Sequence, residues 1–202
     1  IFHKGLGSVA ERNFRPHVNC VNITPDQKYL CAVDLGVDQV KIYKFNYETG
    51  KITLVDMLRC EQESAPRIIK FSPDGRFAYL ICELKNYISV YSYKDGPRGP
   101  IFELVQTIST LNDYHSKGSA ACVLRFSRDW SYVLCSNAGD NSIGIFKVDH
   151  ETGMLEKICI LPISGDYPKA ADFFPDNRHI MSLNHEANTM TIFKINYENT
   201  DT

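Results

Sequence analysis

The feature that most constrains the fold of this chain is an internal repeat. Four segments of equal length align without gaps, and each carries a turn in which Pro or Arg is followed by Asp. The segments begin at Val21, Ile69, Leu124 and Ala171, and their turn positions (Pro25, Pro73, Arg128, Pro175) lie 48, 55 and 47 residues apart. Repeats of roughly 40–50 residues that contain only strand signals are typical of β-propeller blades. The sequence therefore predicts a β-propeller.

Each copy has the same internal order. A short apolar strand enters the Pro-Asp turn, in which Pro presets φ and Asp bonds to its own backbone. A second apolar strand, a polar turn and an alternating third strand such as 40–45 follow, and a hairpin loop leads to a fourth strand. We predict an all-β fold in which the whole chain, 1–202, is one propeller fragment. Its blades cover approximately residues 16–60, 64–110, 117–163 and 166–202, and the last blade lacks its fourth strand.

Composition narrows the function classes. The net charge is −2, with no basic run that would indicate nucleic acid, and no apolar stretch or leader pattern indicates a membrane or a signal peptide. The seven cysteines lack a CxxC spacing, which argues against zinc and disulfides and favours a cytoplasmic location. An open set of blades leaves sheet edges unpaired, so we also expect a tendency to self-associate.

The blade geometry predicts where a site would lie. The first strand of a blade lies nearest the propeller axis, and its start meets the end of the second strand at one rim. Counting six residues back from each turn and ten forward selects two residues per blade, which we expect to converge on one mouth of the central channel. The pairs are Asn19 with Leu35, Arg67 with Glu83, Cys122 with Ala138, and Lys169 with His185.

Two of these pairs suggest catalysis. Arg67 can hold an anion while Glu83 moves a proton, although a structural ion pair is an equal alternative. Lys169 can bind a phosphate or carboxylate and His185 can act near neutral pH, or both can be solvated rim residues. His17 beside Asn19 is a further candidate for substrate contact. The polar loop 113–118 either covers the mouth or is an ordinary surface loop.

These motifs resemble a known family. The run RPHVNCVNITPDQKYLCAVDLGVDQVKIYKF resembles the signature PHxHxxxxSPDGxxxxVxDLGxDxVxxY of the lactonase-type seven-bladed propellers. The run APRIIKFSPDGRFAYLICELKNYISVY resembles their GPRHxxFxPxGxxxYxxNExxxxVxxY. The family includes 6-phosphogluconolactonases and 3-carboxy-cis,cis-muconate lactonizing enzymes. The resemblance implies that this chain corresponds to about the C-terminal four blades of a seven-bladed ring.

The resemblance also implies an activity. The cyclizing members use a His, two Arg and a Glu at the mouth. Arg67 and Glu83 match one Arg and the Glu, whereas Asn19 and Ala138 stand where the His and the second Arg are expected. We therefore expect a hydrolase of sugar-acid lactones, most specifically of 6-phosphogluconolactone, that uses no metal or cofactor. Glu83, His185 and Arg67 would be catalytic, and Arg67, Lys169, His17 and Asn19 would bind an anionic small molecule. Muconate cyclization and a non-catalytic binding module are the alternatives.

Overall fold

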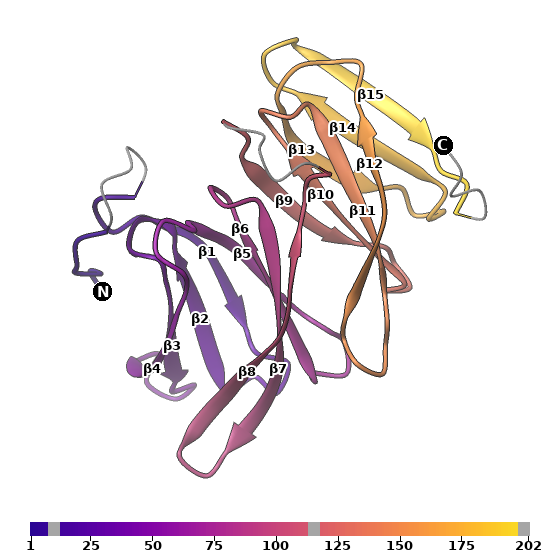
Figure 1. Ribbon diagram of the computed structural model, residues 1–202. Helices are drawn as coiled ribbons and strands as arrows, with labels where there is room; N and C mark the ends of the chain where they lie inside the picture. Colours follow the sequence, from indigo (N-terminus) through magenta and orange to yellow (C-terminus); the bar gives the residue numbers. More distant parts are fainter. Residues whose placement is uncertain (8–12, 113–117, 198–202) are drawn as a thin grey trace. The chain divides into compact units, whose positions relative to one another are not determined.

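The computed structural model describes residues 1–7, 13–112 and 118–197. The chain forms two compact units, residues 1–107 and 108–202, and each unit contains two antiparallel sheets (Figure 1). The predicted covering loop lies, except for Gly118, outside the described residues.

Two four-stranded sheets make up the first unit, each with its strands in chain order. The first sheet consists of β1 (Val18–Ile23), β2 (Tyr29–Asp34), β3 (Gln39–Phe45) and β4 (Ile52–Arg59). The second consists of β5 (Pro66–Phe71), β6 (Phe77–Cys82), β7 (Tyr87–Gly96) and β8 (Gly99–Ser109), whose last two residues belong to the second unit.

The second unit repeats the pattern. Its first sheet consists of β9 (Ala121–Phe126), β10 (Tyr132–Asn137), β11 (Ser142–Val148) and β12 (Leu155–Pro162). Its second sheet has three strands, β13 (Pro168–Phe173), β14 (His179–Asn184) and β15 (Thr189–Lys194). Within the described residues the single helical element is the 3-10 turn η1 (Leu35–Val37). The predicted all-β blades are therefore confirmed.

The core of each unit lies between its two sheets. In the first unit Cys31 and Val33 of β2 pack with Ile69 of β5 and Leu80 of β6, all at most 1% exposed. In the second unit Leu134 of β10 packs in one buried cluster with Ala171 of β13 and Ile180 of β14. Alternation in the strands produces this arrangement, because every second side chain points to the same face. All seven cysteines are free thiols, and four of them are buried in these strands.

A β-bulge interrupts the first strand of every sheet at the same place. The pairing of β5 with β6 passes from Pro66–Cys82 to Ile68–Ile81, so Arg67 is the extra residue that the register skips. The corresponding shifts in the other sheets leave Asn19, Cys122 and Lys169 as the extra residues. These four are the residues selected by counting six back from the turn. Bulges re-aim side chains and are frequent beside active sites.

A second repeated feature lies in the polar turn after the second strand. One residue in each repeat has φ of 52°, in the left-handed region that Asp and Asn tolerate better than other residues. These residues are Asp38, Asn86, Asn141 and Asn188. Within each unit the first of them reaches the next sheet: Asp38 Oδ1 accepts from the backbone N–H of Ala65, and Asn141 Oδ1 from that of Tyr167, both at 2.8 Å.

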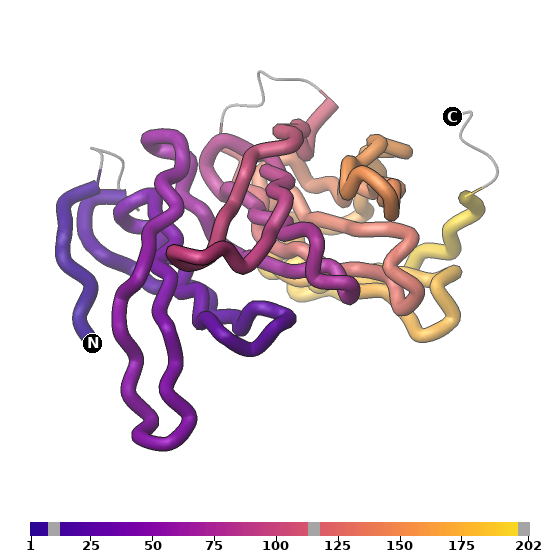
Figure 2. Tube along the Cα trace, turned by 90° about the horizontal axis from the view of Figure 1, so that it is seen from below, coloured from indigo at the N-terminus to yellow at the C-terminus, as the bar shows by residue number. Residues whose placement is uncertain are grey.

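The N-terminal stretch runs alongside the first sheet, as the indigo tube in Figure 2 shows. His3 lies between two buried side chains of that sheet. Its Nδ1 is 2.5 Å from Asp34 Oδ2, and its Nε2 is 3.0 Å from the hydroxyl of Tyr43. Burial and the nearby Asp34 raise the pKa of Tyr43. This chain of contacts fixes the stretch on β2 and β3.

Candidate functional site

The predicted rim pairs share one backbone arrangement. The second residue of each pair comes directly after the last residue of β2, β6, β10 or β14. Its N–H donates to the carbonyl of the residue two before the bulge. The four bonds are Leu35 to His17, Glu83 to Ala65, Ala138 to Ala120, and His185 to Tyr167, at 2.8–3.0 Å. The sequence count therefore identified structurally equivalent positions in all four repeats.

Arg67 and Glu83 lie in direct contact. The guanidinium of Arg67 donates to the carboxylate of Glu83 in an ion pair. The side chain of Glu83 is 1% exposed, whereas that of Arg67 is 28% exposed. The expected proximity of these two residues is confirmed. The ion pair thus joins a buried carboxylate to a partly exposed guanidinium, and the exposed part of the guanidinium can contact an anionic ligand.

The two candidates from the first sheet differ from each other. The side chain of His17 is exposed, and its backbone N–H donates to Asp34 Oδ1 at 2.7 Å. Asn19 is also exposed, but its amide nitrogen donates to the backbone carbonyl of Arg67 at 3.2 Å. Asn19 therefore contacts the backbone of the ion-paired arginine.

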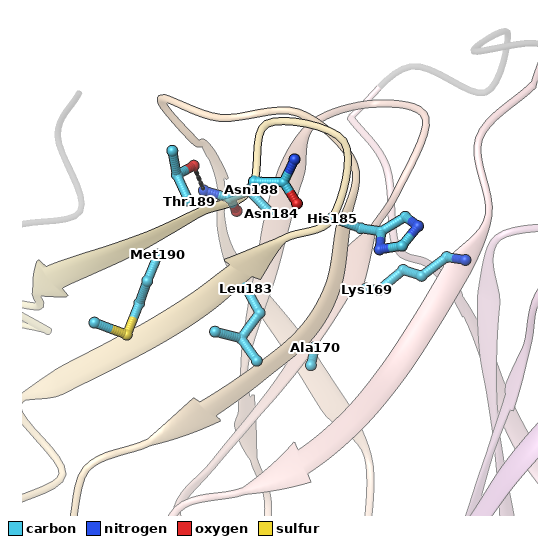
Figure 3. A pocket seen from close by; sticks show the side chains of 8 residues that line it. All are labelled: Lys169, Ala170, Leu183, Asn184, His185, Asn188, Thr189 and Met190. Carbon is cyan, nitrogen blue, oxygen red and sulfur yellow. Dashed lines mark hydrogen bonds between the residues drawn. The ribbon is translucent and has the colours of Figure 1, made fainter.

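Lys169 and His185 line one shallow pocket of about 510 Å³ in the second unit. Figure 3 shows their side chains extending toward the same side of this pocket, while Leu183 and Met190 form its apolar part. The ammonium of Lys169 lies 5.3 Å from the ring centroid of Tyr167, which is within the range of a cation–π contact. Both polar residues are exposed and can reach a ligand.

The corresponding positions of the third repeat carry no charge. Cys122 and Ala138 are buried in a small apolar cluster with Ala120, against which Tyr167 packs. The Asn19–Leu35 and Arg67–Glu83 pairs belong to the first unit, and the Cys122–Ala138 and Lys169–His185 pairs belong to the second. Convergence of all four pairs on one mouth stays a prediction.

Two aspartates of the first sheet hold the rim: Asp34, which the sequence offered as a candidate beside His17 and Asn19, and Asp38, which sequence reasoning missed. Asp34 Oδ1 accepts from the N–H of His17 and from that of Gly36, and Asp34 Oδ2 contacts His3. Asp38 accepts from Asn13 through one oxygen, in addition to its bond from Ala65. Both stand in the DLGVD run, whose spacing was the signal available from the sequence. They hold the rim in place rather than facing a ligand.

The described residues contain neither a metal-binding cluster nor a membrane-spanning helix. Within residues 1–7, 13–112 and 118–197, no group of three or more His, Cys, Asp or Glu side chains is arranged to hold a metal ion. In the same part of the chain, none of the helical structure is long and apolar enough to cross a membrane.

Repeated antiparallel sheets of four strands, the last of three, with equivalent bulged rim positions define this protein as a β-propeller. Comparison with known families gives a more specific result. The chain belongs to the family described as "Lactonase, 7-bladed beta-propeller", whose model matches residues 1–201.

Relatives of known sequence and structure agree with this assignment. An uncharacterized protein of Lactococcus lactis is 35% identical over 192 residues, and 6-phosphogluconolactonase of Bacillus subtilis is 28% identical over 192 residues. Each match covers 95% of this chain and 54% of the relative. The solved structure of a periplasmic gluconolactonase of Pseudomonas aeruginosa is similar, with a TM-score of 0.88 and 28% identity over 97% of this chain and 55% of that one. The chain thus spans about half the length of its relatives.

Proposed function

We propose that the protein to which this chain belongs hydrolyses a sugar-acid lactone, most specifically 6-phosphogluconolactone. Membership of the lactonase family and the 6-phosphogluconolactonase and gluconolactonase among its relatives support a lactone hydrolase. The observation that supports the proposal is the Arg67–Glu83 ion pair, a carboxylate and a guanidinium in contact at the bulged end of a blade. The seven free cysteines support a reducing compartment, the cytoplasm.

The reaction requires three things of the site. A water molecule must lose a proton as its oxygen attacks the lactone carbonyl, and Glu83 is proposed to accept that proton. Negative charge develops on the carbonyl oxygen, and the guanidinium of Arg67 can stabilise it or hold an anionic group of the substrate. The acyl–oxygen bond then breaks, and the ring oxygen takes a proton to give the open hydroxy acid.

The remaining predicted residues have supporting roles in this proposal. Lys169 is proposed to bind the substrate's anionic group, and His185 is the second candidate for the base. His17 and Asn19 are proposed to line the same mouth. We propose that these groups act without a metal ion or an organic cofactor.

Replacement of Glu83 by Gln tests the proposal. The Gln side chain keeps the shape and cannot accept the proton, so kcat for lactone hydrolysis should fall by about 10²–10⁴-fold, as expected for loss of a general base. Arg67→Ala should chiefly raise KM, or lower kcat as well if the guanidinium contacts the carbonyl oxygen. The rate is measured in the complete protein from acid release. A wild-type rate in Glu83→Gln would move the base to His185 or elsewhere.

A matched control is available in the same unit. Glu61 forms an ion pair with Lys85 on the surface, and its side chain is 58% exposed. Glu61→Gln removes a paired carboxylate that lies at no rim position, so its kcat and KM should stay at the wild-type values.

One observation favours a second function. The two rim positions of the third repeat, Cys122 and Ala138, lie in an apolar cluster and offer no charged group to an anion, which suits a propeller that binds a ligand without turning it over. Calorimetry with sugar phosphates separates the two functions. Binding with no hydrolysis of any lactone supports the binding module, and hydrolysis supports the enzyme.

A further inference from the structure

The side chain of Asn19 connects the first sheet to the site residue of the second. Its amide nitrogen donates to the carbonyl oxygen of Arg67 at 3.2 Å, across 48 residues of sequence. The donor is the bulged residue of β1, and the acceptor belongs to the bulged residue of β5. Two equivalent positions of neighbouring repeats therefore contact each other.

The bulge gives this contact its significance. Arg67 is the extra residue of the bulge, so the Cα register of β5 with β6 does not by itself fix its backbone angles. The direction of a bulged side chain follows from its local backbone angles. A donor on the carbonyl of Arg67 restrains those angles, and the guanidinium at the other end of the residue contacts Glu83.

Glu83 is held from its own side as well. Its backbone N–H donates to the carbonyl of Ala65 at 2.8 Å, two residues before Arg67. A hydrogen bond thus holds the backbone of each ion-pair residue. The carbonyl of Arg67 accepts from Asn19 on β1, and the N–H of Glu83 donates to the carbonyl of Ala65, just before β5.

We propose that Asn19 is a positioning residue for lactone hydrolysis, which acts by holding the bulge of Arg67 so that the guanidinium meets Glu83. This inference rests on the function proposed above. It gives Asn19 a role through Arg67 instead of the direct substrate contact expected from the sequence.

Asn22 provides a matched control. Its amide nitrogen donates to the carbonyl of Ile69 at 3.1 Å, which is the same kind of bond between the same two strands. Ile69 is paired regularly with Leu80, so this bond restrains a residue that is already in register. A general contribution to packing of the two sheets would affect both asparagines equally.

The experiment compares Asn19→Leu with Asn22→Leu in the complete protein. Leu approximates the shape of Asn without its donor. Loss of one neutral hydrogen bond is worth about 1 kcal/mol, so kcat/KM of Asn19→Leu should fall about 5-fold. Asn22→Leu should keep the wild-type kcat/KM, even where both variants lower the unfolding temperature. Asn19→Gln, which keeps the amide donor, should recover part of the loss.

A double-mutant cycle shows whether the effect passes through Arg67. In an Arg67→Ala background the guanidinium is absent, so Asn19→Leu should cause no further loss of kcat/KM. A full 5-fold loss in that background, or equal losses in the two asparagine variants, would overturn the positioning role. An Asn19→Leu variant with wild-type kinetics would overturn it as well, while leaving lactone hydrolysis standing. A wild-type protein without lactone hydrolysis overturns the proposed function and the role of Asn19 together.

Discussion

We expect replacement of Asp38 to lower the stability of the first unit, even when the new residue is Asn, which has nearly the same shape. Asp38 is only 7% exposed, and its two carboxylate oxygens together accept four hydrogen bonds. One oxygen accepts from Asn13 Nδ2 and from the N–H of Ala65, both at 2.8 Å, and more weakly from Ser64 Oγ at 3.5 Å. The other oxygen accepts from the N–H of Glu63 at 2.9 Å. Asp38→Asn leaves the backbone untouched, because Asn occupies the equivalent turn position elsewhere with the same φ of 52°.

The cost of Asp38→Asn follows from these contacts. The new amide nitrogen must replace one oxygen, and the donor facing that oxygen then loses its acceptor. A hydrogen bond to a charged group contributes about 1.5–3 kcal/mol, so we expect a loss of about 2 kcal/mol in the free energy of unfolding. At roughly 2–4 °C per kcal/mol for a chain of this size, the unfolding temperature should fall by about 4–8 °C. Asn141 avoids this loss, since its amide nitrogen donates to Asp166 at 3.1 Å.

Urea unfolding measures the global effect, and hydrogen exchange of the Ala65 amide measures the local one. The control is Asp56→Asn, an exposed aspartate on β4, which should change stability by less than about 0.5 kcal/mol. Since Ala65 also holds the backbone of Glu83, faster exchange at Ala65 should accompany a lower kcat. If Asp38→Asn matched Asp56→Asn in stability and left exchange at Ala65 unchanged, our account of the turn would be wrong.

The remaining predictions concern acid stability and association. A hydrogen bond from His179 and two backbone N–H groups lower the pKa of Asp176 to about 2 from 3.8. Because the folded pKa is depressed, this carboxylate stabilises the fold above pH 3.8 and the contribution is lost as pH falls toward 2; NMR titration should show a higher Asp176 pKa in His179→Ala. We also propose that the 202-residue chain self-associates, and light scattering should show a larger mass that decreases when exposed apolar residues are changed to Ser. These residues are Val21 and Ile23 on β1 and Met190 and Ile192 on β15; a monomer at all concentrations tested contradicts the proposal.

The blades were predictable because the same pattern of strands and turns occurs four times in the sequence. A single Pro-Asp turn is an ambiguous signal, but the same turn between the same strand types four times specifies a sheet unit. The proximity of Arg67 and Glu83 followed from counting along a hairpin, since antiparallel pairing brings residues at equal distances from a turn together. In β5 and β6 the count was correct to within the one residue that the bulge inserts.

The bulge itself left no signal in the sequence. Its four residues are Asn, Arg, Cys and Lys, which share neither size nor charge, and the strands around them read as regular. The contact of His3 with Asp34 was equally hidden, because residues 1–7 lie outside the repeat and show no pattern of their own. Both features depend on where backbone groups meet in space, which hydrophobic periodicity does not report.

The bulge also explains how one backbone can carry four different rim chemistries. A residue in regular register is constrained by the side chains directly across the ladder and by the face that it covers. Arg67 and Lys169 are the extra residues of their bulges. Either side chain is therefore accommodated without a change in the strand pairing before and after the bulge. The same freedom allows the apolar Cys122 in the third repeat. The chemistry at these bulged positions can therefore differ between blades without a change in strand pairing. That is why a strongly repetitive sequence can have an ion pair in one blade and an apolar cluster in the next.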